Sequence, residues 1–113
     1  MYTLIIKSRF EAAHFLPEHP GMCRQLHGHS YHVEVEFTGE NLNSTGMLAD
    51  FGDLKAAVKA QLPDHRNLND VMEGPTTTEN IAKWLFDKIA LLSLPISAIT
   101  VWETEGNGCR YTP

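Results

Sequence analysis

The feature that most constrains the fold is a pair of segments, residues 2–14 and 29–38, in which apolar and polar residues alternate. In the second segment the apolar positions are Tyr31, Val33, Val35 and Phe37. Side chains two residues apart on a β-strand point to the same face, so each segment predicts a strand with one buried and one exposed face. The chain must therefore build a sheet, and an all-helical fold is excluded.

Two later segments carry apolar residues at helical spacing, residues 50–62 and 76–93. Asp50 is placed to cap the first helix, and Pro63 ends it. Thr76 is followed by Glu79 three residues later, which is the spacing of a capping box for the second helix.

The rest of the chain predicts two more strands and one loop. Residues 96–104 predict a third strand and residues 108–113 a short fourth, whereas residues 63–76 have no period and predict a loop. The order of elements is then ββααββ. It is typical of an α+β fold, with an antiparallel sheet and two helices packed on one face.

Size and composition bound the possible functions. The chain has 113 residues, of which 42% are hydrophobic, so we expect one domain over residues 1–113. A net charge of −5 without a basic run argues against a nucleic-acid-binding surface. No apolar run approaches the length of a membrane span, and the N-terminus reads as a strand rather than a signal peptide. We therefore expect a cytoplasmic protein that binds neither nucleic acid nor membrane.

Three histidines have the parity of the buried strand faces. His27 and His29 precede Tyr31 with the same parity, and His14 is in register with Leu4, Ile6 and Phe10. In an antiparallel pair, the end of the first strand lies beside the start of the second, so the three imidazoles should converge. Three nitrogen ligands that leave a fourth position open are typical of a catalytic zinc site. The alternative is that the His-x-His pair is only hydrogen-bonded surface histidine.

Other chemically active residues give weaker signals. Cys23 precedes His27 in the loop between the two strands and could act as a base or nucleophile, or it could be an inert buried thiol. Asp64 beside His65 is a possible acid–base pair, although such dipeptides are common. Glu103 could bind an amide N–H edge or could simply be a strand end that meets solvent. No function is predicted for three further residues: His32 and His19 are expected to be solvated, and Cys109 is expected to be an inert thiol.

The chain resembles the 6-pyruvoyltetrahydropterin synthase family, which includes the bacterial 6-carboxytetrahydropterin synthases. The motifs that carry the resemblance are FEAAH at 10–14, CRQLHGHSY at 23–31, DHRNLND at 64–70, TTTEN at 76–80 and VWET at 101–104. Their combination and order are specific, and they cover nearly the whole chain. The C-x3-H-G-H spacing from Cys23 resembles the bacterial carboxy-forming branch, whereas the animal enzymes have a longer gap there.

The resemblance implies a metal site and a catalytic residue beside it. His14, His27 and His29 would be ligands of Zn²⁺, and Cys23 would be the catalytic thiol.

It also implies the remaining site residues. Asp64 and His65 would be acid–base partners, supplied across a subunit interface. Glu103 would anchor the pterin by its guanidine-like N–H edge, and Thr77 and Thr78 would line the pterin pocket.

The implied fold is the tunnelling fold, in which subunits join edge to edge into a barrel, commonly a hexamer of two trimers. The implied reaction converts 7,8-dihydroneopterin triphosphate to 6-carboxy-5,6,7,8-tetrahydropterin in queuosine biosynthesis. The alternatives are formation of 6-pyruvoyltetrahydropterin at the same site, or a non-catalytic module that binds zinc or pterin. Arg9, Arg24 and Arg66 are candidates to hold the triphosphate.

Overall fold

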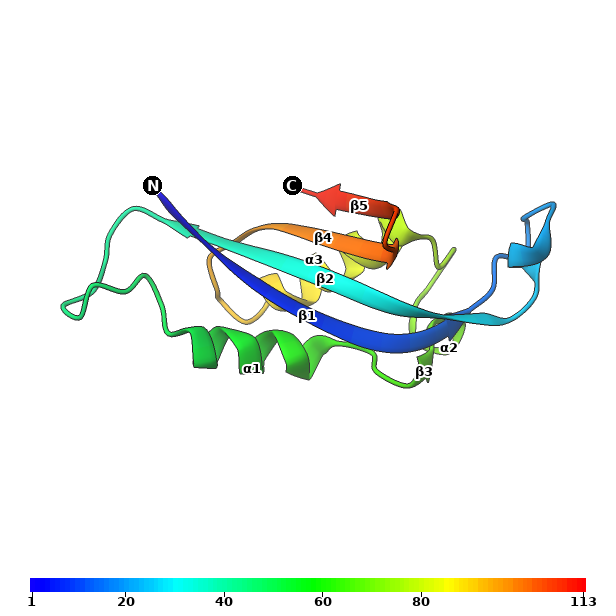
Figure 1. Ribbon diagram of the computed structural model, residues 1–113, viewed down its shortest axis with the longest axis horizontal. Coiled ribbons are helices and arrows are strands. Elements are labelled where there is room, and N and C mark those ends of the chain that lie inside the picture. The colour runs from blue at the N-terminus through cyan, green and yellow to red at the C-terminus, as the bar shows by residue number, and fades with distance from the viewer.

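A five-stranded sheet runs the length of the molecule in the computed structural model, which describes residues 1–113 (Figure 1). The two alternating segments form its longest strands, β1 (Tyr2–His14) and β2 (His27–Gly39), which pair antiparallel throughout. β4 (Ile96–Thr104) pairs with β2, and β5 (Asn107–Tyr111) pairs with β4, both antiparallel. The predicted short fourth strand is thus confirmed as β5.

Two helices cover one face of this sheet, as predicted for an α+β fold. α1 (Phe51–Gln61) packs against β1, and α3 (Thr78–Ala90) packs against β4 and β5 (Figure 1). Asp50 caps α1 as expected, because its side chain accepts the backbone N–H of Asp53. No helix is long and apolar enough to span a membrane.

The start of α3 differs from the prediction. Thr77, and not Thr76, is the N-cap, and its hydroxyl oxygen accepts the backbone N–H of Asn80 at 3.3 Å. Two neighbouring threonines offer the same capping chemistry, so the spacing to Glu79 selected the wrong one. Thr76 lies outside the helix and is fully buried.

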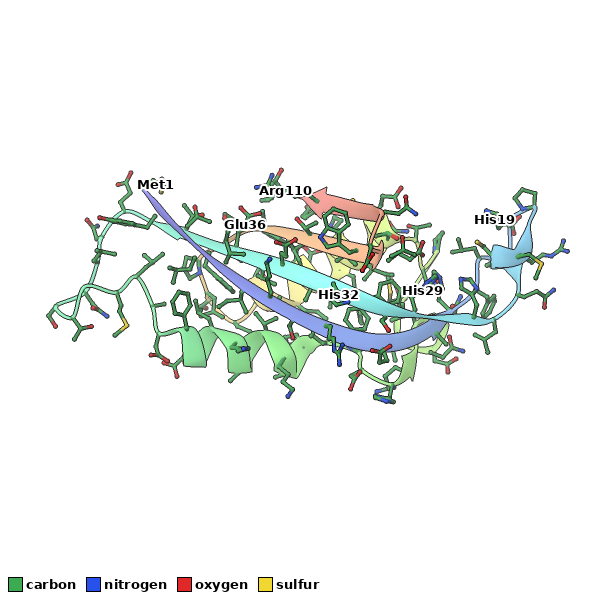
Figure 2. All side chains as sticks on the ribbon, in the orientation of Figure 1. Met1, His19, His29, His32, Glu36 and Arg110 are labelled. Atoms are coloured by element: carbon green, nitrogen blue, oxygen red, sulfur yellow. The ribbon has the colours of Figure 1, made fainter.

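The core lies between the sheet and the helices, and the predicted parity is the buried one. The inward side chains of β2 are at most 1% exposed; they are Tyr31, Val33, Val35 and Phe37. The other face of the sheet is polar: the Arg110 guanidinium donates to the Glu36 carboxylate there, with Nε to Oε2 at 2.9 Å (Figure 2). Burial on one face fixes the register of β2, because a slip by one residue would expose the apolar set.

The segment predicted as a loop contains two short elements. β3 (Arg66–Asn67) pairs parallel with Ala12–Ala13 of β1, and α2 (Leu68–Val71) follows at once. Leu68 is fully buried, so its side chain packs this segment against the core. Elements of two and four residues are too short to show periodicity, so the pattern could not reveal them.

Candidate metal centre and active site

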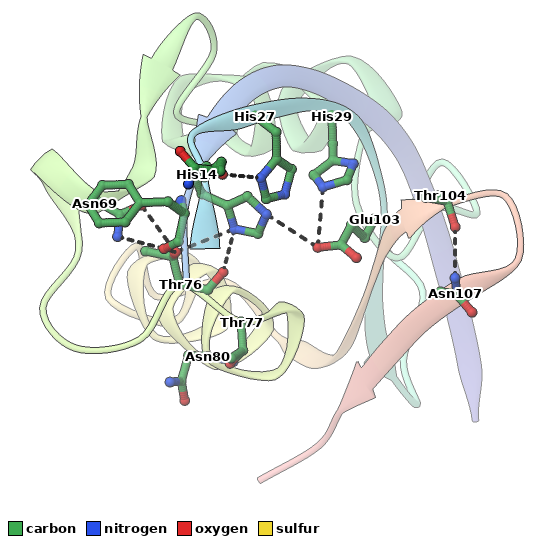
Figure 3. Close-up of polar contacts among 12 residues, drawn as sticks. His14, His27, His29, Asn69, Thr76, Thr77, Asn80, Glu103, Thr104 and Asn107 are labelled. Carbon is green, nitrogen blue, oxygen red and sulfur yellow. Dashed lines mark hydrogen bonds and ion pairs between the residues drawn. The ribbon is translucent and has the colours of Figure 1, made fainter. Parts of the chain in front are cut away.

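The three predicted histidines meet at one end of the β1–β2 pair. The register aligns His14 with His27, and Ala12 with His29, so all three side chains lie on the inner face (Figure 3). One potential ligand atom from each ring lies within 4.8 Å of the others. The predicted convergence is confirmed, and these three residues could hold a metal ion.

Two backbone carbonyls determine which nitrogen of the His14 ring and of the His27 ring is available to bind a metal ion. Nδ1 of His14 lies 2.8 Å from the Thr76 carbonyl oxygen, and Nδ1 of His27 lies 2.7 Å from that of Gln25. A carbonyl can only accept, so each Nδ1 carries the proton and each Nε2 presents a lone pair. Carbonyl partners of this kind are typical of histidines that bind metal through the other nitrogen.

Burial favours the neutral form of two of the three imidazoles, those of His14 and His29. Burial lowers the pKa of His14, and this outweighs the Thr76 carbonyl and the charge of Glu103, which act to raise it. The pKa of His29 is also lowered, again mainly by desolvation. Nε2 of each ring is buried without a hydrogen-bond partner. Neutral rings with unpartnered buried lone pairs fit a transition-metal ion.

Asn69 and Thr76 form a network behind His14 that the sequence reasoning missed. The Asn69 side chain accepts the Phe15 N–H and donates to the Phe15 carbonyl, each at 2.9 Å. The Thr76 hydroxyl lies within 3.3 Å of Asn69 Oδ1 and of the Phe15 carbonyl (Figure 3). The network ties the residue after His14 to the segment whose carbonyl holds the ring. Asn69 belongs to the DHRNLND motif and Thr76 to the TTTEN motif, and this membership is the only sequence signal that could have pointed to them.

Glu103 lies beside the cluster of three histidines. Its Oε1 is 3.5 Å from Nε2 of His14 and 3.6 Å from Nε2 of His29 (Figure 3). Its side chain is 27% exposed. Glu103 is therefore not a solvated strand end, which was the alternative reading of this residue.

Cys23 lies in the connection between β1 and β2, in the 3₁₀ turn η1 (Met22–Arg24). It is half-buried, and its carbonyl accepts the Leu16 N–H at 2.8 Å. Its thiol is not a member of the cluster formed by the three histidines.

Asp64 and His65 form the predicted pair, docked on the edge of β1. Nδ1 of His65 lies 2.9 Å from Oδ2 of Asp64, whose Oδ1 accepts the Glu11 N–H at 2.9 Å. These two bonds, with that from Glu11 the larger effect, lower the pKa of the Asp64 carboxyl. His65 has a positive φ of 57° and donates its own N–H to the Glu11 carbonyl. Both side chains are exposed, and His65 shares with His29 the lining of a depression of about 490 Å³.

The two threonines predicted to line the pterin pocket lie at the start of α3, and the two histidines predicted to be solvated lie away from the cluster. Thr77 lines a second depression, of about 440 Å³, together with Asn69, and Thr78 is half-buried at the first position of α3. His32 is exposed on the outer face, and His19 lies at the tip of the β1–β2 connection (Figure 2). Neither joins the cluster, as predicted.

Comparisons with known proteins agree with this geometry. A 6-carboxy-5,6,7,8-tetrahydropterin synthase from Synechocystis is 41% identical over 98% of this chain and 93% of its own length. A dihydroneopterin monophosphate aldolase from Pyrococcus furiosus is 37% identical over 88% of each chain. The solved structure of 6-pyruvoyl tetrahydropterin synthase from Caenorhabditis elegans superposes with a TM-score of 0.89 at 30% identity, covering 99% of this chain and 95% of that one.

The model of one family, 6-pyruvoyl tetrahydropterin synthase, matches residues 3–113. The fold shared with the nematode enzyme confirms the predicted tunnelling fold. The chain therefore belongs to the 6-pyruvoyl tetrahydropterin synthase family of pterin lyases.

Proposed function

We propose that the chain is a zinc-dependent lyase that converts 7,8-dihydroneopterin triphosphate and water to 6-carboxy-5,6,7,8-tetrahydropterin, acetaldehyde and triphosphate. The observation that carries the proposal is the cluster of three imidazoles, two of which, His14 and His29, present a buried Nε2 without a partner, together with Cys23 in the connection that precedes His27. The similarity to the Synechocystis enzyme over nearly the full length of both chains supports this product. We place the reaction in queuosine biosynthesis and in the cytoplasm.

His14, His27 and His29 would hold the zinc ion. Bound there, the ion would polarise the hydroxyls of the substrate side chain and make their protons more acidic. Three nitrogen donors leave one position for that ligand.

Cys23 and the Asp64–His65 pair would move the protons. The Cys23 thiolate would abstract protons at the side-chain carbons, and the His65 imidazole, oriented by Asp64, would relay them. His65 faces solvent, so we propose that it serves the site of a neighbouring subunit. Thr77, Thr78 and Glu103 would contact the substrate.

The open edges of the sheet support an assembly, which we propose is a hexamer of two trimers. β3 covers only Ala12–Ala13 of β1, and β5 leaves its outer edge unpaired. Tyr2 and Ile5 are about half exposed near the free part of β1. Exposed strand edges with apolar neighbours are sites of strand pairing between chains.

The test is product analysis by mass spectrometry after the purified protein is incubated with dihydroneopterin triphosphate. The proposal expects 6-carboxytetrahydropterin and acetaldehyde in equal amounts, and a His27→Ala/His29→Ala variant that is folded, metal-poor and inactive. Accumulation of 6-pyruvoyltetrahydropterin would favour the alternative synthase activity. Carbon–carbon cleavage of dihydroneopterin monophosphate would point to the aldolase activity named for the Pyrococcus relative. Binding without turnover would leave a zinc- or pterin-binding module.

A further inference from the structure

Most of the cationic side chains that have no partner line one groove at the edge of the sheet. Of the nine Lys and Arg residues, Lys7, Lys83 and Arg110 form ion pairs, and Lys88 donates to a backbone carbonyl. The other five side chains form no ion pair or hydrogen bond within the chain; they are Arg9, Arg24, Lys55, Lys59 and Arg66. In a chain with a net charge of −5, a cluster of such cations is available to an anion from outside.

Three of these five side chains line a single groove of about 360 Å³ between the edge of β1 and α1; they are Arg9, Lys55 and Lys59. Lys55 and Lys59 are four residues apart, so they are neighbours on one face of α1, separated by one helical turn. Arg9 belongs to β1, against which α1 packs. We call this depression the cationic groove. It spreads its charges over a strand and one turn of a helix, which suits a chain of anionic groups.

The two carboxylates at the border of the cationic groove are engaged elsewhere. Asp64 accepts the Glu11 N–H with one oxygen, and its other oxygen lies 2.9 Å from Nδ1 of His65. The Glu11 carboxylate accepts the hydroxyl of Ser30. None of these contacts involves the three cations of the groove, which therefore keep their full capacity to bind an anion.

The cationic groove adjoins the acid–base pair of the proposed site. His65 lines this groove and also the depression of about 490 Å³ that contains His29 and Arg66. In dihydroneopterin triphosphate the phosphate chain is attached to the end of the same side chain on which His65 would act. The phosphate groups therefore have to lie a few bonds away from this imidazole, and the cationic groove is the positively charged surface next to it.

We propose that Arg9, Lys55 and Lys59 form the subsite for the triphosphate chain of the substrate and select a triphosphate over a monophosphate. A phosphate monoester carries a charge of about −1.5 to −2 and offers one anionic group, whereas a chain of three phosphates can contact all three cations. Arg24 lies in η1, lines neither depression and is not part of this subsite. The inference rests on the proposed function, because it takes the phosphate chain to belong to the substrate on which His65 acts.

The first experiment titrates the zinc-loaded protein by calorimetry with inorganic triphosphate and with inorganic phosphate. Triphosphate should bind more tightly, and its affinity should fall as the ionic strength rises, because salt screens exposed charges. An exposed charge pair is worth up to about fivefold in affinity, so Lys55→Gln/Lys59→Gln should lower the affinity for triphosphate about tenfold. Lys83→Gln, the same change at an exposed lysine of α3, is the matched control and should keep the wild-type affinity.

The second experiment measures turnover of dihydroneopterin triphosphate by the same variants. In Lys55→Gln/Lys59→Gln the KM should rise about tenfold with little change in kcat, because contacts with the phosphate chain form on binding and persist during the reaction. The kinetic constants of Lys83→Gln should equal those of the wild type.

Two results of the titration would overturn the inference: equal affinity of the double variant and the wild type for triphosphate, or a wild type that binds triphosphate no better than phosphate. Weaker binding of triphosphate with an unchanged KM would also overturn it, because the groove would then serve another polyphosphate. A wild type that binds triphosphate in this groove but does not convert the pterin would instead refute the proposed function, and the polyphosphate subsite would still be supported.

Discussion

Asn69→Ala tests whether the network behind His14 prepares the ring for metal. The variant loses two bonds to the Phe15 backbone at 2.9 Å and one from the Thr76 hydroxyl at 3.3 Å. Each such bond contributes roughly 0.5–1.5 kcal/mol, and water can reach the half-buried Phe15, so the free energy of unfolding should fall by about 2 kcal/mol. Loss of an outer-shell partner typically costs about 10- to 100-fold in metal affinity.

Two assays separate these effects. Urea unfolding of the metal-free protein, followed by circular dichroism, gives the stability, and competition with a chromophoric chelator gives the Zn²⁺ affinity. Asn107→Ala removes a single exposed bond to Thr104 and is the matched control, for which neither quantity should change. A less stable Asn69→Ala protein with wild-type metal affinity would refute the reasoning, because the network would then be structural only.

Three further predictions follow from the site and its surroundings. Cys23→Ala should keep its metal and fold but lose about 10²–10⁴-fold in turnover, as expected for a removed base; unchanged turnover in a steady-state assay would make Cys23 an inert thiol. The lowered pKa values of His14 and His29 mean that the unfolded chain takes up protons first as the pH falls below 6.5. The free energy of unfolding of the metal-free protein should therefore decrease below that pH, by at most about 1.4 kcal/mol per pH unit for each ring, and a flat stability curve would contradict the burial of the rings. Gly108→Ala should lower the melting temperature, because its Cβ would lie 2.6 Å from the Trp102 ring; an unchanged melting temperature would show that the ring moves freely.

Sequence patterns predicted the parts of the molecule in which buried and exposed side chains follow the regular period of a strand or a helix. The alternation of apolar and polar residues predicted which face of β2 is buried. Because His14 has the parity of the buried face of β1, the pattern also predicted that His14 lies beside His27 and His29. Strand geometry fixes such relations over a few residues, so they can be read without a structure.

The parts that were missed depend on contacts distant in sequence. Asn69 and Thr76 lie in a segment without a period, and their partners, His14 and Phe15, are more than 50 residues away. The proximity of Glu103 to two histidines likewise depends on how β4 pairs with β2. No local pattern contains this information.

The division of the site between near and distant residues has a consequence for folding. All three histidines belong to one pair of strands adjacent in the chain, whereas the carbonyl that fixes the His14 tautomer comes from Thr76, 62 residues away. Contacts that are local in sequence tend to form before those that close long loops. A β1–β2 hairpin can therefore gather the imidazoles early, with the His14 ring still free to turn. The ring takes its final orientation only when the segment around Thr76 docks, so zinc added during refolding should report that late step rather than hairpin formation.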